Sequence, residues 1–549
     1  MSALLTLRQQ DGTVTLFTLR ITCLLSKRES AMYLTQGLHR SVATTPDRSA
    51  TIFGDRVRTF AEQIDRVARL AAGLQSIGVA KDDRVAMLAF NSDRYAEYLL
   101  AVPWADAVLN PVNIRWSPVE VAYALNDSDT KVLLVDDTFG AMVPALRDAC
   151  PGLESIVYCG DGETPAGMVS YEKLVADHEP IPDVRRSGSE LAGLFYTGGT
   201  TGFPKGVMLS HANLITSGLG TVATGQLLDD DSILLHAAPM FHLADLAAWV
   251  GQVMLGGTHV MIPFFEPTAV LGAIAKHSIT DVLLVPTMIQ MLVDHPALAE
   301  YDTSSMSRVL YGGSPISAGV LERTLARLPG VRLTQAYGMT ELAPVASLLW
   351  PEHHVGARIG SAGRAAPHSE IRIVGADGEE LTTGAVGEIC VRGGHVMVGY
   401  WNKPEETAAA IRDGWMHTGD VGYLDPEGFL FVVDRLKDMI ITGGENVYSA
   451  EVESALSRHP AVLACAVIGV PDGEWGERVH ACVVLAEGAS PTAEELREHT
   501  RTYVAGYKAP RTFEFLPALP MSGAGKILKR DLRDAYEAQD SKDGLGIPQ

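Results

Sequence analysis

Residues 196–206 read YTGGTTGFPKG and directly follow Leu191–Phe195, an apolar run typical of a buried strand. Glycines let the backbone turn so that successive N–H groups face an anion, while threonine hydroxyls add donors and a lysine adds positive charge. The stretch is not a Walker loop, because Lys205 stands between Pro204 and Gly206. We therefore expect a phosphate-binding loop, with an ordinary solvent loop as the alternative. Its candidate binding residues are Thr197, Gly198, Gly199, Thr200, Thr201, Gly202 and Lys205.

The segments around this loop alternate helical patterns with short apolar runs. Glu62–Ile77 has apolar residues at helical spacing. Val85–Phe90, Val132–Val135 and Val282–Val285 are short apolar runs of the kind found in strands buried on both faces. This alternation predicts an α/β fold in which helices cover mainly parallel sheets.

Two smaller units are expected toward the C-terminus. Closely spaced strand patterns with Gly and Asp turns, between residues 371 and 433, predict a small β unit. Helix patterns at Ala450–Ser457 and Ala493–Val504 then predict a compact α+β unit. We expect a large N-terminal domain of βα-layered sheets plus the small β unit at 32–434, a small C-terminal domain at 438–536, and a frayed polar tail at 537–549.

Residues 1–31 form an N-terminal appendage outside this expected fold. Leucines there are interrupted by Arg8, Asp11, Arg20 and Lys27, whereas a signal peptide needs an unbroken apolar stretch and a small-residue cleavage site. The most apolar window elsewhere, Leu246–Phe265, contains polar residues and glycines and indicates buried core instead of a membrane span. We therefore expect no transmembrane segment.

The charge balance limits the partners. The 549 residues carry 44 Lys and Arg against 66 Asp and Glu, which gives a net charge of −22. A surface this acidic repels phosphate backbones, so nucleic-acid binding is not expected. A small phosphate-bearing ligand remains compatible, because a glycine loop and a few cations suffice to bind it.

The cysteine pattern bears on the compartment. The six cysteines lie far apart and form no C-x-x-C pair. That spacing argues against a zinc site or a disulfide framework and favours a reducing, cytoplasmic location.

Five further motifs follow the glycine-rich loop in order. They are Gln335-Ala336-Tyr337-Gly338-Met339-Thr340-Glu341, Thr418-Gly419-Asp420, Asp434-Arg435-Leu436-Lys437-Asp438, Gly443-Gly444-Glu445-Asn446 and Pro520–Lys526. Together the six motifs, spread over residues 32–535, resemble those of the acyl-adenylate-forming superfamily of acyl-CoA synthetases, peptide-synthetase adenylation domains and firefly luciferase.

The resemblance implies an ATP site and assigns roles within it. Glu341 would hold Mg²⁺ against the phosphates, and Thr340 would bond a phosphate oxygen. Asp420 would accept both ribose hydroxyls, since a carboxylate offers two acceptor oxygens, and Arg435 would contact the same ribose. Tyr337 would stack on the adenine. Gln335, Ala336, Gly338 and Met339 complete the implied nucleotide site, and the implied catalytic residues are Lys526, Thr340 and Lys205.

The resemblance also implies a mobile C-terminal domain. The family rotates this domain between two half-reactions about a hinge that maps here to 435–437, with Lys437 as the hinge residue. One pose delivers Lys526 to the charge developing between carboxylate and α-phosphate. The other presents Gly443 and Gly444, where absent side chains let a pantetheine arm pass.

Two further sets of residues have both a functional and a purely structural interpretation. Trp475, Tyr507, Lys508 and Arg511 resemble contacts to CoA in acid–CoA ligases, but a packed aromatic and ordinary surface cations explain them equally well. His242 and Ala244, in the segment Pro239–Ala244, would line the acid pocket, although His242 could be a buried core histidine. Tyr311, Gly312, Gly313 and Ser314 would form the opposite wall, with the two glycines leaving room for a flat or long apolar group.

The resemblance implies an ATP-dependent carboxylic acid–CoA ligase that forms AMP and pyrophosphate through an acyl-adenylate. A medium- or long-chain fatty acid is the leading substrate, because Ala244 should leave the cavity deep, and an aryl or arylpropenoic acid is second. A stand-alone adenylating enzyme that loads a carrier protein and a luciferase-like oxidation are the other classes. The expected partners are the acid, ATP, CoA and Mg²⁺, and a homodimer is compatible with these.

Overall fold

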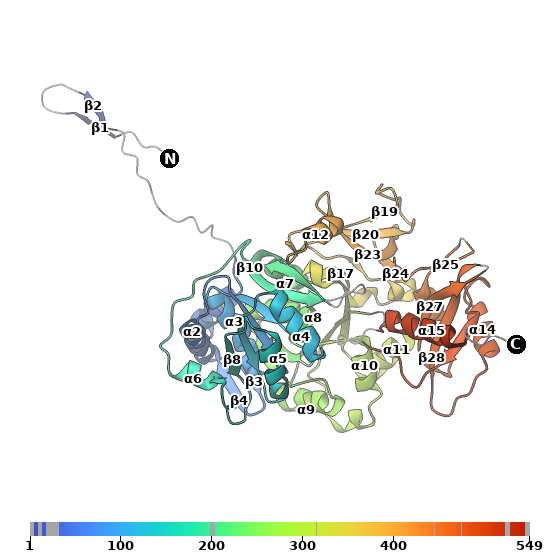
Figure 1. The fold of residues 1–549 in the computed structure, drawn as a ribbon, viewed down its shortest axis with the longest axis horizontal. Coiled ribbons are helices and arrows are strands. Elements are labelled where there is room, and N and C mark those ends of the chain that lie inside the picture. The colour runs from blue at the N-terminus through green and yellow to red at the C-terminus, as the bar shows by residue number, and fades with distance from the viewer. Residues whose placement is uncertain are drawn as a thin grey trace. The chain divides into compact units, whose positions relative to one another are not determined.

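The computed structural model describes residues 5–8, 14–17, 32–197, 204–314, 316–436, 438–443, 445–473, 475–521 and 527–543. Contacts divide the chain into two units, Met1–Ala31 and Met32–Gln549. In the first unit, β1 (Leu5–Arg8) pairs antiparallel with β2 (Val14–Phe17). The second unit contains all the other elements; they are numbered in chain order, and Figure 1 labels many of them.

The first large sheet contains the strand that ends at the glycine-rich loop. Its eight strands lie in the order β21-β11-β10-β6-β5-β7-β8-β9. The strands from β10 to β9 in this order are parallel, as the βα alternation predicted. β11 instead returns antiparallel beside β10. The bounds are β5 (Arg84–Leu88), β6 (Val108–Pro111), β7 (Val132–Val135), β8 (Ser155–Tyr158), β9 (Val169–Ser170), β10 (Leu191–Thr197), β11 (Lys205–Ser210) and β21 (Gly399–Tyr400).

The second large sheet has nine strands in the order β18-β17-β16-β15-β14-β12-β13-β3-β4. It is parallel from β3 to β16 and has antiparallel strands at both edges. The bounds are β3 (Ser49–Phe53), β4 (Arg56–Thr59), β12 (Ile233–His236), β13 (Thr258–Met261), β14 (Asp281–Leu284), β15 (Arg308–Gly312), β16 (Arg332–Gly338), β17 (Val345–Leu349) and β18 (Arg364–Ala365).

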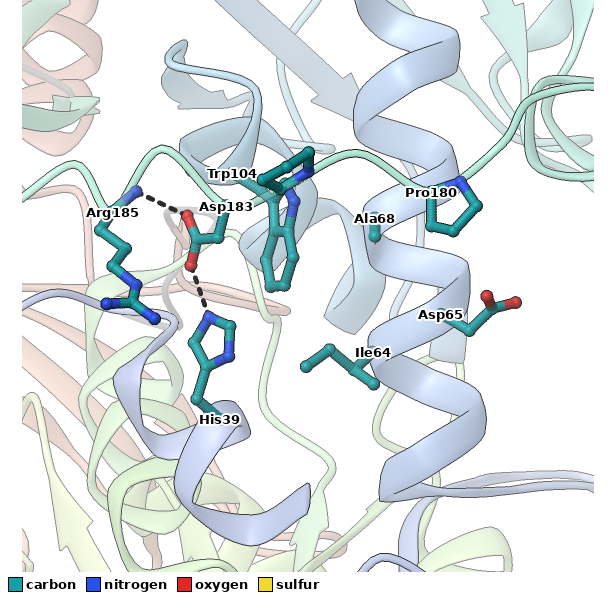
Figure 2. A pocket seen from close by; sticks show the side chains of 9 residues that line it. His39, Ile64, Asp65, Ala68, Trp104, Pro180, Asp183 and Arg185 are labelled. Carbon is teal, nitrogen blue, oxygen red and sulfur yellow. Dashed lines mark hydrogen bonds and ion pairs between the residues drawn. The ribbon is translucent and has the colours of Figure 1, made fainter. Parts of the chain in front are cut away.

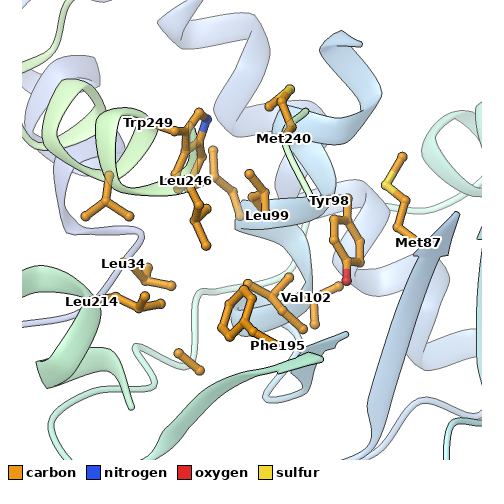
Figure 3. Close-up of a cluster of buried hydrophobic side chains, with 14 of the residues drawn as sticks. Leu34, Met87, Tyr98, Leu99, Val102, Phe195, Leu214, Met240, Leu246 and Trp249 are labelled. Atoms are coloured by element: carbon orange, nitrogen blue, oxygen red, sulfur yellow. The ribbon is translucent and has the colours of Figure 1, made fainter. Parts of the chain in front are cut away.

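Helices cover both sheets, and one core cluster contains residues from both. α3 (Asp93–Trp104) is buried along its whole length, and its Leu99 and Val102 pack near Phe195 of β10 and Trp249 of α8 (Figure 3). A fully buried helix of this kind joins two layers of structure, because each of its faces covers a different neighbour. The helices of this domain are α1 (Gln36–Thr44), α2 (Phe60–Ser76), α3, α4 (Pro118–Asp127), α5 (Val143–Ala149), α6 (Tyr171–Ala176), α7 (His211–Val222), α8 (Leu243–Leu255), α9 (Pro267–His277), α10 (Pro286–Val293), α11 (Ala318–Arg327) and α12 (Pro404–Ala410).

A small antiparallel sheet follows, as the closely spaced strand patterns predicted. Its strands lie in the order β19-β20-β23-β22, and β24 pairs with β23. The bounds are β19 (Glu370–Val374), β20 (Gly387–Arg392), β22 (Ile411–Arg412), β23 (Trp415–Leu424) and β24 (Leu430–Arg435).

The C-terminal segment forms a separate sheet with its own helices, so the mixed α/β class with a large first domain and a small second one is confirmed. Figure 1 shows α15 beside β27 and β28. α15 includes residues 537–543, where we expected a frayed tail, because Leu532 and Tyr536 anchor the helix to the sheet. The elements are β25 (Ile440–Thr442), β26 (Glu445–Val447), α13 (Ser449–Leu456), β27 (Val462–Asp472), β28 (Gly476–Leu485), α14 (Ala493–Arg501), β29 (Thr512–Phe515) and α15 (Lys529–Asp543).

Among the described residues, no helix combines the length and the apolar character needed to cross a membrane.

Candidate active site

Several predicted site residues lie outside the described part of the chain. They are Gly198, Gly199, Thr200, Thr201, Gly202, Lys437, Gly444 and Lys526. The two ends of the glycine-rich loop are described, and they face each other: Thr197 ends β10, Lys205 begins β11, and the two pair in register. A hairpin therefore fixes both ends of the predicted phosphate loop.

The motif at residues 335–341 lies where β16 leaves its sheet. Gln335 to Gly338 end β16, and Thr340 and Glu341 lie in a short 3-10 helix, Thr340–Leu342. A side chain at Gly338 would place its Cβ 1.8 Å from the carbonyl oxygen of Pro344, so only glycine allows this approach. The backbone N–H of Met339 donates to the same oxygen at 3.0 Å. This packing turns Glu341 inward, where it is buried.

Tyr400 connects the two predicted phosphate-site charges. Its hydroxyl donates to Oε1 of Glu341 at 2.8 Å, and the Lys205 ammonium lies 5.1 Å from the centre of its ring. Burial and the neighbouring Glu341 carboxylate raise the pKa of Tyr400, so the phenol stays protonated and can donate. Sequence reasoning missed Tyr400, because β21 pairs with β11 across a long separation in sequence.

The predicted ribose site is assembled around Asp420. The Tyr337 hydroxyl donates to Oδ2 of Asp420 at 2.7 Å, and Nε of Arg435 lies 3.4 Å from Oδ1. Asp420 and Arg435 are cross-strand partners on β23 and β24. Burial and the Asp420 carboxylate raise the pKa of Tyr337. The structure thus brings together three residues that the sequence placed in separate motifs.

Glu388 holds the part of β23 that carries Asp420, and sequence reasoning also missed it. Its Oε1 accepts from the backbone N–H of Gly419 at 3.2 Å, and its Oε2 lies 2.7 Å from Nδ1 of His417. Both contacts cross from β20 to β23, so a motif search along the chain could not find them.

The two neighbours of the predicted hinge residue bond to different parts of the molecule. The N–H of Leu436 donates to the carbonyl of Gly419 at 2.9 Å, in the small β unit. The carboxylate of Asp438 accepts from Arg533 of α15 at 2.8 Å, in the C-terminal domain. A backbone rotation between these two residues would therefore move one domain against the other.

Two hydrogen bonds of the Asn91 side chain fix the backbone of the segment predicted to line the acid pocket. Asn91 donates to the carbonyl of Ala238 at 2.8 Å and accepts from the N–H of Met240 at 2.8 Å. His242 is the N-cap of α8, where its Nδ1 accepts from the N–H of Ala244 at 3.4 Å. The imidazole therefore has a local structural role at the point where the acid pocket was predicted.

Ala244, which is predicted to line the acid pocket, packs against an apolar cluster that we name the pocket floor after that prediction. The floor consists of Val222, Leu228, Leu234, Ala238, Ala248 and Leu283. A cavity of about 20 Å³ lies among its side chains, and it is also lined by the ion pair Asp281–Arg308, in which Arg308 Nη2 donates at 2.9 Å. That space holds about one water molecule. The floor is therefore well filled beyond Ala244.

The opposite wall of the predicted acid pocket differs from the expectation at Gly312, where we expected room for the acid. Tyr311 is buried, and its hydroxyl lies 3.0 Å from Nε2 of His354. A Cβ at Gly312 would lie 2.3 Å from the carbonyl oxygen of Ala336, so β16 fills the space that we expected to serve the acid. Gly313 has a φ of +81°, which explains glycine there through backbone conformation. Ser314 follows it on the same turn.

The predicted CoA contacts fall into two groups. Trp475 lies against Gly443: the Gly443 N–H donates to the Trp475 carbonyl at 2.8 Å, and the Arg511 guanidinium lies 4.7 Å from the Trp475 ring centre. Lys508 instead donates to Glu451 at 2.6 Å, beside the exposed Tyr507. The first group offers an exposed aromatic next to a cation, whereas the Lys508 charge already has a partner.

A surface pocket of about 490 Å³ lies elsewhere on the large domain. His39, Ile64, Trp104, Asp183 and Arg185 are among the residues that line it, and Nε2 of His39 lies 2.8 Å from Asp183 (Figure 2). None of the predicted site residues lines this pocket.

Comparison with known families identifies both domains. The model of the AMP-binding enzyme family matches residues 38–401, and that of the AMP-binding enzyme C-terminal domain matches residues 451–526. The first match contains the motifs around Lys205 and Glu341, and the second contains Trp475 and Lys526.

Individual relatives are similar along nearly the whole chain. A feruloyl-CoA synthase of Amycolatopsis sp is 43% identical over 498 residues, which cover 90% of this chain and 98% of the relative. The fatty acid–[acyl-carrier-protein] ligase ScoC of Streptomyces coeruleorubidus is 37% identical, covering 89% of this chain and 94% of the relative. The crystal structure of ATP-bound MatB from Rhodopseudomonas palustris matches with a TM-score of 0.84 and 30% identity, over 92% of this chain and 99% of that one.

Proposed function

The chain belongs to the AMP-binding enzyme family and is an ATP-dependent acid–CoA ligase, and we propose that the acid it activates is an arylpropenoic acid. The observation that carries the proposed acid is the filled pocket floor beyond Ala244.

The first half-reaction joins two anions. A carboxylate oxygen of the acid attacks the α-phosphorus of ATP, the bond to the β-phosphate bridging oxygen breaks, and pyrophosphate leaves with the electron pair. Catalysis of such a step depends on positioning and on positive charge near the phosphates, because no protein nucleophile is needed. Lys205 supplies a positive charge at the end of the predicted phosphate loop. The Lys205 ammonium lies over the Tyr400 ring, and the Tyr400 hydroxyl donates to Glu341, so Tyr400 contacts both charged groups.

Glu341 fits a magnesium site. Its buried carboxylate has Oε1 fixed by Tyr400, and magnesium in nucleotide sites is bound by one or two carboxylates together with substrate phosphates. When bound, the ion would neutralise phosphate charge.

Asp420 would orient the nucleotide. With Tyr337 on one oxygen and Arg435 near the other, the carboxylate is held in one orientation while its remaining lone pairs can accept the ribose hydroxyls. Fixing the ribose aligns the α-phosphorus with the acid, which turns a bimolecular encounter into an oriented one.

The second half-reaction transfers the acyl group to sulfur. The CoA thiolate attacks the acyl carbonyl, the bond to the phosphate oxygen breaks, and AMP leaves. The pantetheine arm would pass beside Gly443 and Trp475; glycine is required at 443 because a Cβ there would lie 2.6 Å from the Trp475 ring. Arg511 would attract the CoA phosphates next to that ring.

The filled floor favours a short, flat acid over a long one. A cavity of about 20 Å³ cannot take an acyl tail, so the filled floor favours an acid that needs no space there, such as an aromatic ring with a three-carbon side chain. The 43% identity to a feruloyl-CoA synthase supports the same class. A medium- or long-chain fatty acid is the second candidate, supported by the 37% identity to a fatty acid ligase.

A panel of acids tests the proposal. We would measure kcat/KM from AMP release with ferulate, cinnamate, hexanoate, decanoate and palmitate, each with CoA and with a carrier protein as acceptor. The arylpropenoic acids should exceed the fatty acids by about 10–100-fold, which is the discrimination that a hydrophobic pocket achieves by size. A higher kcat/KM for decanoate or palmitate than for ferulate would contradict the proposed acid and leave the ligase assignment intact.

A further inference from the structure

Three metal-binding side chains meet on one face of the C-terminal sheet. His480 and Cys482 lie two residues apart on β28, so both point to the same face, and Glu514 on β29 is the cross-strand neighbour of Cys482. A nitrogen of His480, the sulfur of Cys482 and a carboxylate oxygen of Glu514 all lie within 4.8 Å of one another.

The imidazole of His480 is oriented as a metal ligand would be. His480 is buried, and its Nδ1 lies 2.8 Å from the hydroxyl of Thr512. Nε2 is also buried, has no hydrogen-bond partner among the described residues, and lies 3.8 Å from Oε2 of Glu514. If Nδ1 donates its proton to Thr512, the lone pair of Nε2 faces the other two side chains. A second residue that fixes the ring in this way is a regular feature of metal-bound histidines.

The charges of the three side chains also suit a bound cation. A bound metal ion deprotonates a coordinating thiol, and the resulting thiolate and carboxylate charges would balance a divalent cation.

The site is covered but reachable. The Tyr536 ring of α15 packs 4.8 Å from the His480 ring, and Leu532 belongs to the same apolar cluster as Cys482. The Glu514 side chain is 29% exposed, which leaves a path from solvent to the donors.

We propose that His480, Cys482 and Glu514 bind one Zn²⁺ ion, with a water molecule as the fourth ligand. Zinc is bound tetrahedrally by imidazole, thiolate and carboxylate donors, whereas magnesium and calcium take oxygen donors. The ion would connect β28 to β29 beneath α15 and so stabilise the C-terminal domain. Cysteine spacing predicted no zinc site, but spacing cannot reveal a site with one cysteine and ligands from two strands.

A second cluster with the same donor types has a structural explanation of its own. Glu388, Cys390 and His417 also lie within 4.8 Å, but both oxygens of Glu388 accept hydrogen bonds from described groups. The Arg412 guanidinium lies 3.3 Å from the same carboxylate and supplies its positive charge. We therefore assign that cluster to the support of the β23 segment that carries Asp420.

Metal titration of the full-length enzyme tests the zinc site. The protein would be stripped with a chelator, titrated with Zn²⁺ alone, and separately with Co²⁺. Wild type should bind about one ion per chain, and cobalt should show the absorption of a tetrahedral site and a thiolate-to-cobalt charge-transfer band. Zinc should also raise the Tm, because a ligand that binds only the folded state stabilises it.

Variants locate the ion. Cys482→Ser should lose the charge-transfer band, and His480→Gln and Glu514→Gln should each weaken zinc binding by at least about tenfold. Cys465→Ser, at another buried cysteine of the same sheet, should keep the band and the stoichiometry. Glu514→Gln alters a partly exposed side chain, so it decides the question even if a change in the buried pair prevents folding.

Two results would overturn the site. One is a stripped wild-type protein that binds no zinc at micromolar concentration. The other is zinc binding that is equally tight in wild type, Cys482→Ser and Glu514→Gln, because the ion would then lie elsewhere.

Discussion

The hydroxyl of Tyr337 donates a hydrogen bond to Oδ2 of Asp420 at 2.7 Å, although 83 positions separate the two residues. Tyr337 belongs to the nine-stranded sheet and Asp420 to the small antiparallel sheet, so the bond joins two parts of the large domain. The carboxylate is thereby oriented before a nucleotide binds. Preorganisation of this kind lowers the entropy cost of binding.

Asp420→Asn should raise the KM for ATP about 10–100-fold, because hydrogen bonds to a charged group contribute about 1.5–3 kcal/mol. The KM for the acid should stay unchanged. Tyr337→Phe is the matched variant: it removes one neutral donor and should raise the KM for ATP by about tenfold or less. Steady-state kinetics with ATP and acid varied separately measure both. An effect of Asp420→Asn confined to the acid would show that this carboxylate does not bind the nucleotide.

Glu388→Gln should weaken ATP binding without contact to the nucleotide. The substitution removes the charge that accepts from the Gly419 N–H and lies 2.7 Å from Nδ1 of His417, and leaving such buried groups poorly paired costs about 1–3 kcal/mol. We expect kcat/KM for ATP to fall about 5–100-fold. The control is Glu370→Gln, an exposed ion-pair partner of Arg392 on the same sheet, which should change little.

A double variant separates positioning from general damage. If Glu388 acts through Asp420, the double variant Glu388→Gln/Asp420→Asn should lose less kcat/KM for ATP, expressed as a free energy, than the two single variants lose in sum. Fully additive losses would place Glu388 outside the nucleotide site.

Leu283→Ala should widen the acid specificity. Leu283 belongs to the pocket floor and lines its small cavity, so truncation should open space beyond Ala244. The ratio of kcat/KM for decanoate to that for ferulate should rise about tenfold, since a few buried methylenes contribute about 0.8 kcal/mol each. Leu271→Ala, at a buried leucine of another cluster, should cost similar stability, about 2–5 kcal/mol, without changing the ratio. If the ratio is unchanged in Leu283→Ala, the cluster named the pocket floor does not line the acid pocket.

Lys437→Pro should separate the two half-reactions. Proline fixes φ near −65°, and the residues on either side bond to different domains through Gly419 and Arg533. Adenylate formation, followed by pyrophosphate release, should persist, while thioester formation slows. Normal turnover of this variant in the presence of CoA would contradict a hinge at Lys437.

The fold was largely predictable because its buried strands can be recognised as short apolar runs in the sequence. Val132–Val135 became β7 without change, and Leu191–Phe195 forms most of β10, since strands buried on both faces must be apolar throughout. The end of α15 was not predictable from composition: residues 537–543 are polar, and the helix continues because Leu532 and Tyr536 anchor it.

The site was predictable only where chemistry lies in a continuous motif. Lys205, Glu341 and Asp420 came from such motifs, and their places in the site remain predictions. Tyr400 and Glu388 act through contacts between strands that are distant in sequence, so no spacing reveals them. Gly312 was interpreted as room for a ligand, whereas the close approach of β16 requires it.

The most direct test of the central claim is the balance of products from ferulate. Enzyme, ATP, Mg²⁺, ferulate and CoA would be incubated, and AMP and the CoA thioester quantified by mass spectrometry. We expect equal amounts of AMP and feruloyl-CoA, and without CoA only enzyme-bound feruloyl-adenylate, in an amount no greater than the enzyme. AMP without a matching thioester, or no AMP from any arylpropenoic acid, would contradict the central claim.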